Sequence, residues 1–294
     1  MNHSFQGTGV AIVTPFRKYG TVDFSSLENL IEHLISNNVD YIVALGTTGE
    51  SAALNDDEKN ATVEYVVETV AKRVPVVVGA GGNYTASVIK EVKKLHNKGI
   101  DGILSVAPYY NKPQPKGLYY HYKNIATATN LPVILYNVPG RTGVNIPADI
   151  TLQLSYDVEN IVAIKEASGN FDQIGSIIKD KPDDFAVISG DDQLTLPLIA
   201  MGASGVISVT ANAFPRQFAA MVKSALNNDI ENARTIHYQL TAIMEALFAD
   251  GNPAGEKAAL DELGILKNNL RLPLVKVNKS VNVMIKKALE DFAG

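Results

Sequence analysis

Short apolar runs recur along the chain and are separated by stretches with helical periodicity. Each run is almost continuously apolar and does not alternate between apolar and polar positions, a pattern typical of parallel strands buried on both faces. Eight runs have this character: GVAIVTP (9–15), YIVALG (41–46), PVVVGAG (75–81), GILSVAP (102–108), PVILYNVP (132–139), IVAIKEA (161–167), FAVISG (185–190) and GVISVTA (205–211).

The segments between these runs predict amphipathic helices. SSLENLIEHLISNN (25–38) repeats leucine and isoleucine at intervals of three and four residues, which gives one apolar face. Asn55 and Glu58 have the spacing of a capping box at a helix start. Gly99 suits the position just past a helix end, and Pro147 suits the first position of a helix.

Eight strands alternating with helices predict the α/β class and a (β/α)8 TIM barrel, because open doubly wound sheets usually have about five or six strands. The barrel is expected to occupy residues 1–224. Residues 225–294 show helical periodicity without a clear strand. They are therefore expected to form a C-terminal helical extension packed on the barrel.

Composition narrows the possible functions. The 294 residues carry a net charge of −5 and no basic run, which argues against nucleic acid or an anionic membrane surface as a partner. The lack of cysteine excludes disulfides, thiolate catalysis and Cys-based metal sites. No apolar run approaches the roughly 20 residues that span a bilayer, and the first residues lack the pattern of a signal peptide. A cytoplasmic protein is expected.

In a barrel of this kind, catalytic side chains lie at the carboxyl ends of the strands. The predicted strand ends supply hydroxyls, lysine and arginine but no histidine, so zinc or histidine-based acid–base chemistry has little support. The motifs at these ends are GTTGES (46–51), PYYNKP (108–113), YNVPGRTG (136–143), KEAS (165–168) and SGDDQ (189–193).

Lys165 is a charged residue near the end of an otherwise apolar strand. Strict alternation along the strand places Ile161, Ala163, Lys165 and Ala167 on one face, where the two alanines leave room for a long side chain. Burial away from water favours the neutral, nucleophilic form of an amine, so a lysine here is a candidate to form a Schiff base with a carbonyl substrate. The alternative is a strand-end lysine whose stem packs while its ammonium group reaches water.

The other motifs have simple structural explanations when each is taken alone. Tyr136 can be a core tyrosine with a satisfied hydroxyl, and GTTGES can be a tight turn instead of a carboxylate site at a helix start. Arg141 can be a solvated loop charge or a fork that binds a carboxylate. The two aromatic residues of PYYNKP can close a loop or pack at a subunit contact, and Asp191 can cap the next helix. Together, at one end of one barrel, they indicate a site for a substrate with a carbonyl and a carboxylate.

In order and spacing, GTTGES, PYYNKP, YNVPGRTG, KEAS and GVISV resemble the dihydrodipicolinate synthase family, part of the pyruvate-dependent lyase superfamily of (β/α)8 barrels. The resemblance runs from GVAIVTPF (9–16) to LRLPLV (270–275). It implies a lyase that condenses pyruvate with aspartate 4-semialdehyde in lysine and diaminopimelate biosynthesis, without a metal or nucleotide cofactor. It also implies a homotetramer built as a dimer of dimers, with a dimer as the alternative.

The resemblance implies a role for each matching residue. Lys165 forms the imine with pyruvate, and Tyr136 donates and accepts protons near the imine carbon. Thr47 and Tyr110 complete a hydroxyl relay, with Tyr110 contributed by the neighbouring subunit. The implied substrate-binding residues are Thr47, Thr48, Gly190 and Ile207 around pyruvate and Arg141 at the carboxylate of the semialdehyde.

The same superfamily supplies the main alternative. N-acetylneuraminate lyases and 2-keto-3-deoxy-sugar-acid aldolases share the lysine and the tyrosine. Sialic acid lyases usually carry serine in place of Thr47 and lack an arginine after the YNxP segment, so Thr47 and Arg141 favour the synthase. A non-catalytic barrel that binds keto acids and a purely structural protein are the alternatives from other classes.

One stretch departs from the family pattern. Synthases inhibited by lysine usually carry histidines shortly after GES, where this chain has Asp56 and Lys59. An acid and a base there change the charge of the inter-subunit pocket, so weak or no inhibition by lysine is predicted. The residues that still match a possible allosteric pocket are Ser51, Ala52, Asn83 and Tyr109.

Overall fold

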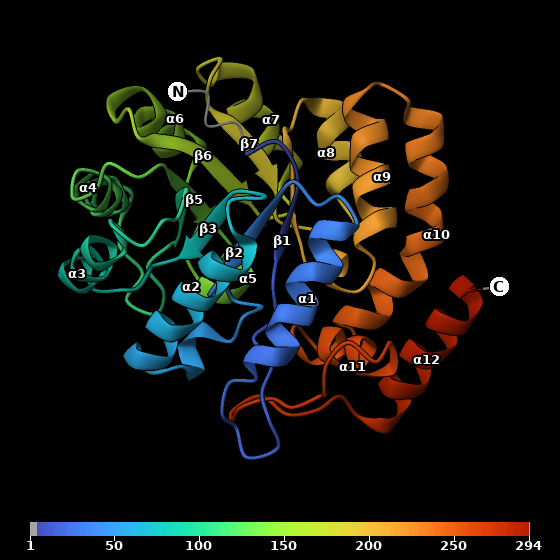
Figure 1. Ribbon diagram of the computed structural model, residues 1–294. Coiled ribbons are helices and arrows are strands. Elements are labelled where there is room, and N and C mark those ends of the chain that lie inside the picture. Colours follow the sequence, from blue (N-terminus) through green and yellow to red (C-terminus); the bar gives the residue numbers. More distant parts are fainter. Residues whose placement is uncertain (1–4, 294) are drawn as a thin grey trace.

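The computed structural model describes residues 5–293 and contains a closed barrel of eight parallel strands (Figure 1). Each strand pairs with its neighbours in chain order, and β8 closes the barrel on β1. The predicted (β/α)8 barrel is therefore confirmed. The strands are β1 (Gly7–Ala11), β2 (Tyr41–Ala44), β3 (Val76–Gly79), β4 (Gly102–Val106), β5 (Val133–Asn137), β6 (Ile161–Glu166), β7 (Ala186–Ser189) and β8 (Gly205–Ser208).

The strands end earlier than the apolar runs that predict them. The first run extends to residue 15 but β1 ends at Ala11, and the second extends to residue 46 but β2 ends at Ala44. The reason is that the loops at the carboxyl ends are buried too, as Leu45 and Val138 show. Apolar character thus continues past the last strand hydrogen bond.

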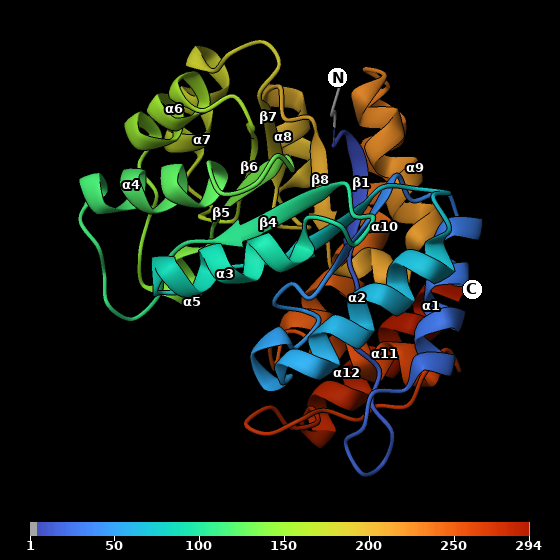
Figure 2. The same ribbon diagram turned by 60° about the vertical axis from the view of Figure 1, so that its left-hand side comes forward.

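Twelve α-helices lie within the described residues, and most surround the barrel (Figure 2). The capping box of Asn55 and Glu58 is confirmed, because each side chain accepts the backbone N–H of the other. The helices are α1 (Phe24–Ser36), α2 (Asp56–Val70), α3 (Thr85–Leu95), α4 (Pro115–Ala126), α5 (Pro139–Thr142), α6 (Ala148–Asp157), α7 (Phe171–Asp180), α8 (Thr195–Met201), α9 (Pro215–Leu226), α10 (Ile230–Phe248), α11 (Ala254–Glu262) and α12 (Lys279–Ala293), with short 3-10 turns η1 (Ser51–Ala53) and η2 (Thr210–Asn212).

Two predicted helix ends are displaced. Helix α3 stops at Leu95, and Gly99 (φ +74°) lies in the turn that leads to β4 and not directly after the helix. Helix α6 begins at Ala148. Pro147, in extended conformation, is therefore its N-cap residue and not its first helical residue as predicted. Both shifts reflect the general difficulty of locating helix termini from residue type alone.

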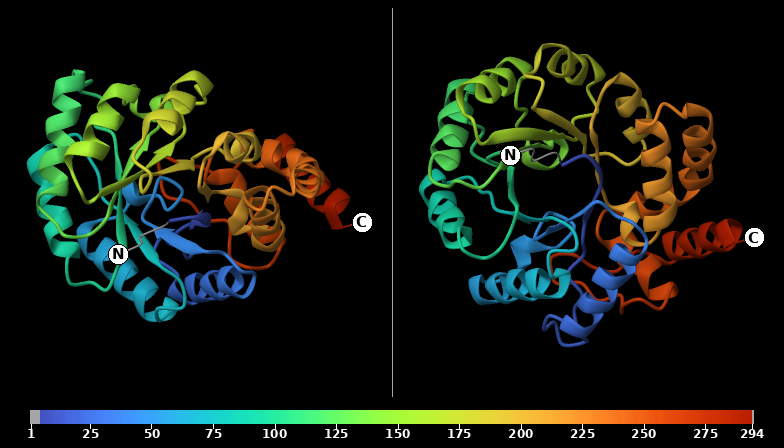
Figure 3. Two further views of the ribbon diagram at one scale, coloured as in Figure 1. Left: turned by 90° about the horizontal axis from the view of Figure 1, so that it is seen from above. Right: turned by 45° about the horizontal axis from the view of Figure 1, so that its top comes forward.

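The C-terminal helices lie on one side of the barrel, next to α9 (Figure 3). Helix α9 ends at Leu226, two residues beyond the predicted boundary at 224. Leu240 and Ile243 of α10 belong to the same apolar cluster as Val10 and Leu27 of the barrel, so the extension shares a core with it. Whether residues 225–294 form a separate unit stays a prediction.

Strand β6 contains a bulge that changes which residues face the barrel interior. Val133 of β5 pairs with Ile161, whereas Ile134 pairs with Ala163, so Val162 has no opposite residue. Ala163 lies in the inner cluster and Val162 packs against it, whereas Ile161 belongs to an outer cluster. The predicted shared face of Ile161 and Ala163 is therefore wrong, because a β-bulge interrupts the two-residue period.

Within residues 5–293, no helix combines the length and the apolar character needed to cross a membrane.

Candidate active site

Lys165 lies at the carboxyl end of β6 and is 5% exposed. It pairs in register with Tyr136 of β5, and its Nζ lies 4.5 Å from the centre of the Tyr136 ring. Tyr136 is buried as well and belongs to the inner cluster that fills the barrel. Neighbouring strands therefore bring an amine and a phenol hydroxyl into one small region.

Glu166 holds the strand end that carries Lys165, a role that the sequence analysis missed. Its buried carboxylate accepts hydrogen bonds from Asn137 Nδ2 (2.7 Å), Gln173 Nε2 (2.7 Å) and the Ser168 hydroxyl (2.6 Å). Because side chains alternate, Glu166 points outward where Lys165 points inward. A carboxylate directly after the lysine, followed two residues later by serine, is the signal that could have indicated it.

Gly190 follows β7 and approaches the lysine stem closely. A Cβ atom at this position would lie 2.7 Å from Ala167 Cβ and 3.0 Å from Lys165 Cε. Contacts that short are not tolerated in a packed interior. Glycine at 190 therefore leaves room for Ala167 and the Lys165 stem. That Ala163 and Ala167 leave space for the lysine stays a prediction.

Thr47 and Thr48 lie in the loop after β2, called the threonine loop below, between residues of unusual backbone conformation. Leu45 (φ 55°) and Glu50 (φ 51°) both adopt the left-handed conformation that is uncommon for residues other than glycine. The Thr48 hydroxyl accepts a hydrogen bond from Asn252 Nδ2 at 2.9 Å. Thus a residue after α10 holds the threonine loop.

Arg141 lies in the short helix α5 at the exposed rim of the site. Its Nη2 donates to the backbone oxygen of Asn252 at 3.4 Å, a long contact that leaves most of the guanidinium free to bind an anion. Asn252 therefore contacts both the arginine and the threonine loop, although sequence analysis assigned it no role. The Gly–Asn–Pro break between α10 and α11 was the available signal.

Asp192 is a further buried carboxylate on the site. It accepts hydrogen bonds from Thr210 N (2.7 Å), Thr210 Oγ1 (2.7 Å) and Val209 N (3.1 Å), which tie the loop after β7 to the turn after β8. Burial raises the pKa of Asp192 above its ordinary value, and the Thr210 hydrogen bonds partly offset that rise. By contrast, Asp191 Oδ1 accepts from Gln193 N and Leu194 N ahead of α8, close to the predicted cap.

A cavity of about 580 Å3 at the carboxyl ends of the strands, called the main cavity below, brings most predicted site residues together. Thr47, Thr48, Tyr136, Arg141, Lys165 and Gly190 line it, together with Asp191, Asp192, Gln193, Phe248 and Asn252. Ile207 does not line this cavity and lies in the inner cluster of the barrel. The C-terminal extension contributes to the cavity wall and does more than pack on the barrel.

Tyr110 lies away from this cavity. It is 89% exposed and adopts a left-handed backbone conformation (φ 72°), which is strained for a bulky residue. Asn83 stabilises the same loop, since its Nδ2 donates to the Tyr109 carbonyl at 3.1 Å and its own carbonyl accepts from Asn111. The loop is therefore held in place while the Tyr110 ring projects outward.

A second cavity of about 390 Å3 is lined by two of the predicted allosteric residues, Asn83 and Tyr109. Asp56 and Lys59, which stand where lysine-inhibited relatives usually have histidines, line it too, together with Glu91 and Lys94. Ser51 lines a smaller neighbouring cavity that also reaches Thr47 and Tyr136. Ala52 is exposed and lines neither cavity.

The chemistry available at the main cavity is that of an amine and several hydroxyls. Among residues 5–293, no cluster of three or more histidine, aspartate or glutamate side chains has an arrangement suited to a metal ion. A buried lysine amine beside a tyrosine hydroxyl can attack a carbonyl carbon and exchange protons with the product. Arg141 at the rim can pair with a carboxylate. The fold and this arrangement of side chains suit a (β/α)8 barrel enzyme that acts on a carbonyl substrate.

Comparison with known proteins agrees with this class. The model of the dihydrodipicolinate synthetase family matches residues 4–292, so the chain belongs to that family. It is 52% identical over 272 residues to the 4-hydroxy-tetrahydrodipicolinate synthase of Parabacteroides distasonis, an alignment that covers 92% of each chain. The crystal structure of dihydrodipicolinate synthase from Aquifex aeolicus superposes with a TM-score of 0.96 at 42% identity, covering 98% of both chains. The chloride-inhibited synthase from Acinetobacter baumannii, complexed with pyruvate, gives 0.96 at 40% identity over 99% of both chains.

Proposed function

We propose that this chain is a 4-hydroxy-tetrahydrodipicolinate synthase, a lyase (EC 4.3.3.7) of lysine and diaminopimelate biosynthesis. It condenses pyruvate with L-aspartate 4-semialdehyde. The observation that carries the proposal is the position of the Lys165 amine 4.5 Å from the Tyr136 ring, in a cavity that Arg141 also lines. The complex of the Acinetobacter baumannii relative with pyruvate supports the same keto acid as the first substrate.

The reaction begins when the neutral amine of Lys165 attacks C2 of pyruvate. Loss of water gives an imine, and removal of a proton from C3 gives an enamine. The enamine carbon forms a bond to the aldehyde carbon of the semialdehyde. The amino group of that substrate then attacks the imine carbon, closes the ring and releases the Lys165 amine.

Hydroxyl groups handle the protons in this proposal. Tyr136 would donate and accept protons at the imine carbon, and Thr47 would continue the relay away from it, since both line the cavity with Lys165. Thr47 and Thr48 would bind the pyruvate carboxylate, and Arg141 the carboxylate of the semialdehyde. Every step is a proton transfer or the making or breaking of a C–N, C–O or C–C bond, so no metal or nucleotide is required.

Arg141 separates the synthase from the sugar-acid aldolases and sialic acid lyases. Replacing it with alanine is expected to raise KM for aspartate semialdehyde by about 30-fold, because a charge-assisted pair of hydrogen bonds is lost. An enzyme-coupled assay of the condensation measures this KM.

The same coupled assay tests the aldehyde preference of the wild-type protein, with N-acetylmannosamine and glyceraldehyde each offered together with pyruvate. Turnover of either sugar aldehyde at a rate comparable to the semialdehyde would overturn the synthase assignment.

The neighbouring subunit is proposed to supply Tyr110. Its ring is exposed, and its loop holds it in a strained conformation that a role outside its own subunit would explain. A dimer is the smallest assembly that satisfies this proposal, and a dimer of dimers is the form expected from the family.

Mixing two impaired variants tests the shared site when the semialdehyde concentration is well below the raised KM of Arg141→Ala. Tyr110→Phe and Arg141→Ala each impair one component, so hybrid dimers contain one site with both original residues. Mixed and re-equilibrated samples are therefore expected to recover about a quarter of wild-type activity. Tyr110→Phe alone should lose most activity, and a wild-type rate in that variant would remove Tyr110 from the relay.

Lysine is expected to inhibit this enzyme weakly or not at all. In the second cavity, Lys94 pairs with Asp56 at 3.4 Å, and Glu91 lies close to Lys59. Burial raises the pKa of Glu91, and the neighbouring Lys59 ammonium partly offsets this. Acidic and basic side chains whose charges already pair with one another contribute little binding free energy to a zwitterion such as lysine. Initial rates at increasing lysine concentration measure the effect, and half-maximal inhibition below about 1 mM would contradict it.

A further inference from the structure

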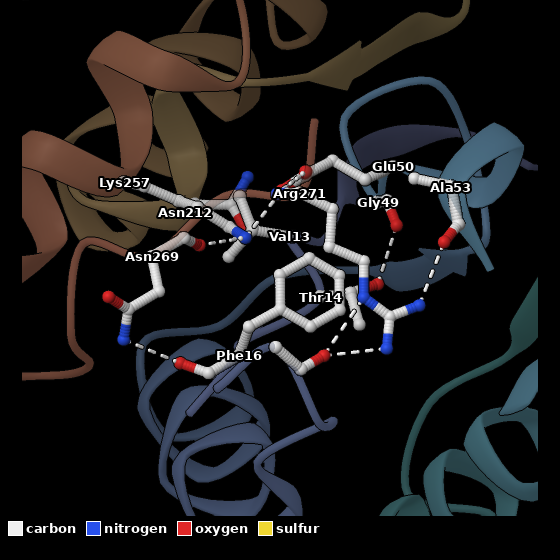
Figure 4. Close-up of polar contacts among 11 residues, drawn as sticks. Val13, Thr14, Phe16, Gly49, Glu50, Ala53, Asn212, Lys257, Asn269 and Arg271 are labelled. Atoms are coloured by element: carbon white, nitrogen blue, oxygen red, sulfur yellow. Dashed lines mark hydrogen bonds and ion pairs between the residues drawn. The ribbon is translucent and has the colours of Figure 1, made fainter. Parts of the chain in front are cut away.

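A buried ion pair lies next to the threonine loop and does not line the main cavity. Lys257 of α11 donates to Glu50 Oε1 at 2.5 Å, and both side chains are 0% exposed (Figure 4). The same Nζ donates to the Asn269 carbonyl at 2.8 Å and lies 4.2 Å from the centre of the Phe16 ring. Its contacts therefore join α11, the segment after it and the loop after β2.

Glu50 is the residue through which this pair acts on the threonine loop. Its N–H donates to the Thr47 carbonyl at 3.1 Å, so Glu50 closes the turn that contains both threonines. Its second carboxylate oxygen accepts from Arg271 N at 3.1 Å, and Arg271 Nη1 donates to the Ala53 carbonyl at 2.8 Å. The C-terminal extension thus holds the chain on both sides of the turn.

The loop is held at two more points. The Thr14 hydroxyl donates to the Gly49 carbonyl at 2.6 Å, and Asn252 donates to the Thr48 hydroxyl at 2.9 Å. Three successive residues, Thr48, Gly49 and Glu50, are therefore each anchored from outside the loop. Such anchoring fixes the backbone around the hydroxyls that face the cavity.

Stability alone does not explain a charged pair at this position. Well-packed apolar residues of similar volume usually stabilise a protein as well as a buried ion pair does. Burial lowers the pKa of Lys257 to about 8, and the charge of Glu50 opposes this shift. Glu50 is also held in a left-handed conformation that costs free energy. An ion pair that forms despite these costs in desolvation and backbone strain fits a role in fixing the geometry of the threonine loop.

We propose that Lys257 is a positioning residue for the keto-acid substrate. Through Glu50, it sets the threonine loop so that Thr47 and Thr48 present their hydroxyls to the pyruvate carboxylate. This inference rests on the proposed function, in which those threonines bind pyruvate. It assigns to Lys257 of the C-terminal extension control of the affinity for pyruvate and not of the affinity for the semialdehyde.

The test compares wild type with the double variant Glu50→Gln/Lys257→Met, which removes both charges and leaves neither unpaired. KM for pyruvate is expected to rise about tenfold, because a binding loop that is no longer preorganised must be ordered by the ligand. KM for aspartate semialdehyde should stay within about twofold. The pyruvate concentration that gives half-maximal borohydride trapping should rise by the same factor as the pyruvate KM.

Leu154→Ala is the matched control, since it loosens a separate apolar cluster around α6. It is expected to lower the melting temperature and leave both KM values unchanged, as a purely structural effect would. If the double variant does not fold, Glu50→Gln/Lys257→Gln carries the test with a smaller expected rise of about threefold, because it also leaves no buried charge unpaired and keeps a donor near the Asn269 carbonyl. An unchanged pyruvate KM in a folded variant overturns the inference. Failure of wild type to trap pyruvate would instead overturn the proposed function.

Discussion

Lys165→Met is expected to lower kcat by at least about 10⁴-fold, the scale of loss seen when a nucleophile is removed from a catalytic unit. Methionine keeps the length and apolar contacts of the lysine stem beside Gly190 and Ala167, so the fold should persist. The missing amine prevents imine formation, and no other lysine lines the main cavity among the described residues. The coupled assay measures the rate, and a thermal melt confirms folding.

Two outcomes distinguish a nucleophile from a residue that only shapes the cavity. If Lys165 provides the amine, Lys165→Arg should be as inactive as Lys165→Met, because a guanidinium stays protonated and does not form the imine. If Lys165 served only as a positive charge, arginine would restore much of the rate. Activity of Lys165→Met within about a hundredfold of wild type would remove Lys165 from the chemistry.

Tyr136→Phe is expected to lower kcat by about 10²- to 10³-fold, the contribution typical of one positioned acid–base group. The phenylalanine ring can keep the packing over Lys165, where Nζ lies 4.5 Å from the ring centre, so the change removes the hydroxyl alone. Imine formation should become slow but remain detectable, because the amine is still present. Stopped-flow or quenched trapping with pyruvate measures that rate separately from turnover.

Tyr122→Phe provides the matched control for Tyr136→Phe. Tyr122 is also buried, and its hydroxyl donates to the Ser105 carbonyl at 3.3 Å, away from the main cavity. Loss of that hydrogen bond should cost about 1 kcal/mol of stability and leave kcat within about twofold of wild type. Equal losses of kcat in both variants would show that the effect at Tyr136 is structural and not a proton transfer.

The barrel could be predicted from sequence because each strand is buried on both faces and is therefore marked by a local apolar run. Lys165 and Tyr136 could be singled out from the sequence for the same reason, since a polar residue is conspicuous near the end of such a run. The bulge at Val162 could not be predicted from the sequence, because a change of register depends on the neighbouring strand and leaves no local pattern. Ile161 was consequently placed on the wrong face.

The contribution of the C-terminal extension to the site also lay beyond sequence reasoning. Asn252 and Thr48 are 204 residues apart, and Lys257 and Glu50 are 207 apart. Nothing in either segment alone indicates that their side chains meet. A buried lysine in a helix resembles an ordinary surface lysine in sequence until the tertiary structure shows what covers it.

The central claim is that Lys165 forms a covalent imine with pyruvate. Incubation of the wild-type protein with pyruvate and borohydride, followed by intact-mass and peptide analysis, tests it directly. The account predicts one adduct per chain, with the mass of pyruvate less one water plus the two hydrogens of reduction, located on Lys165 and missing from Lys165→Met. An unmodified wild-type protein, or an adduct on another lysine, would contradict it.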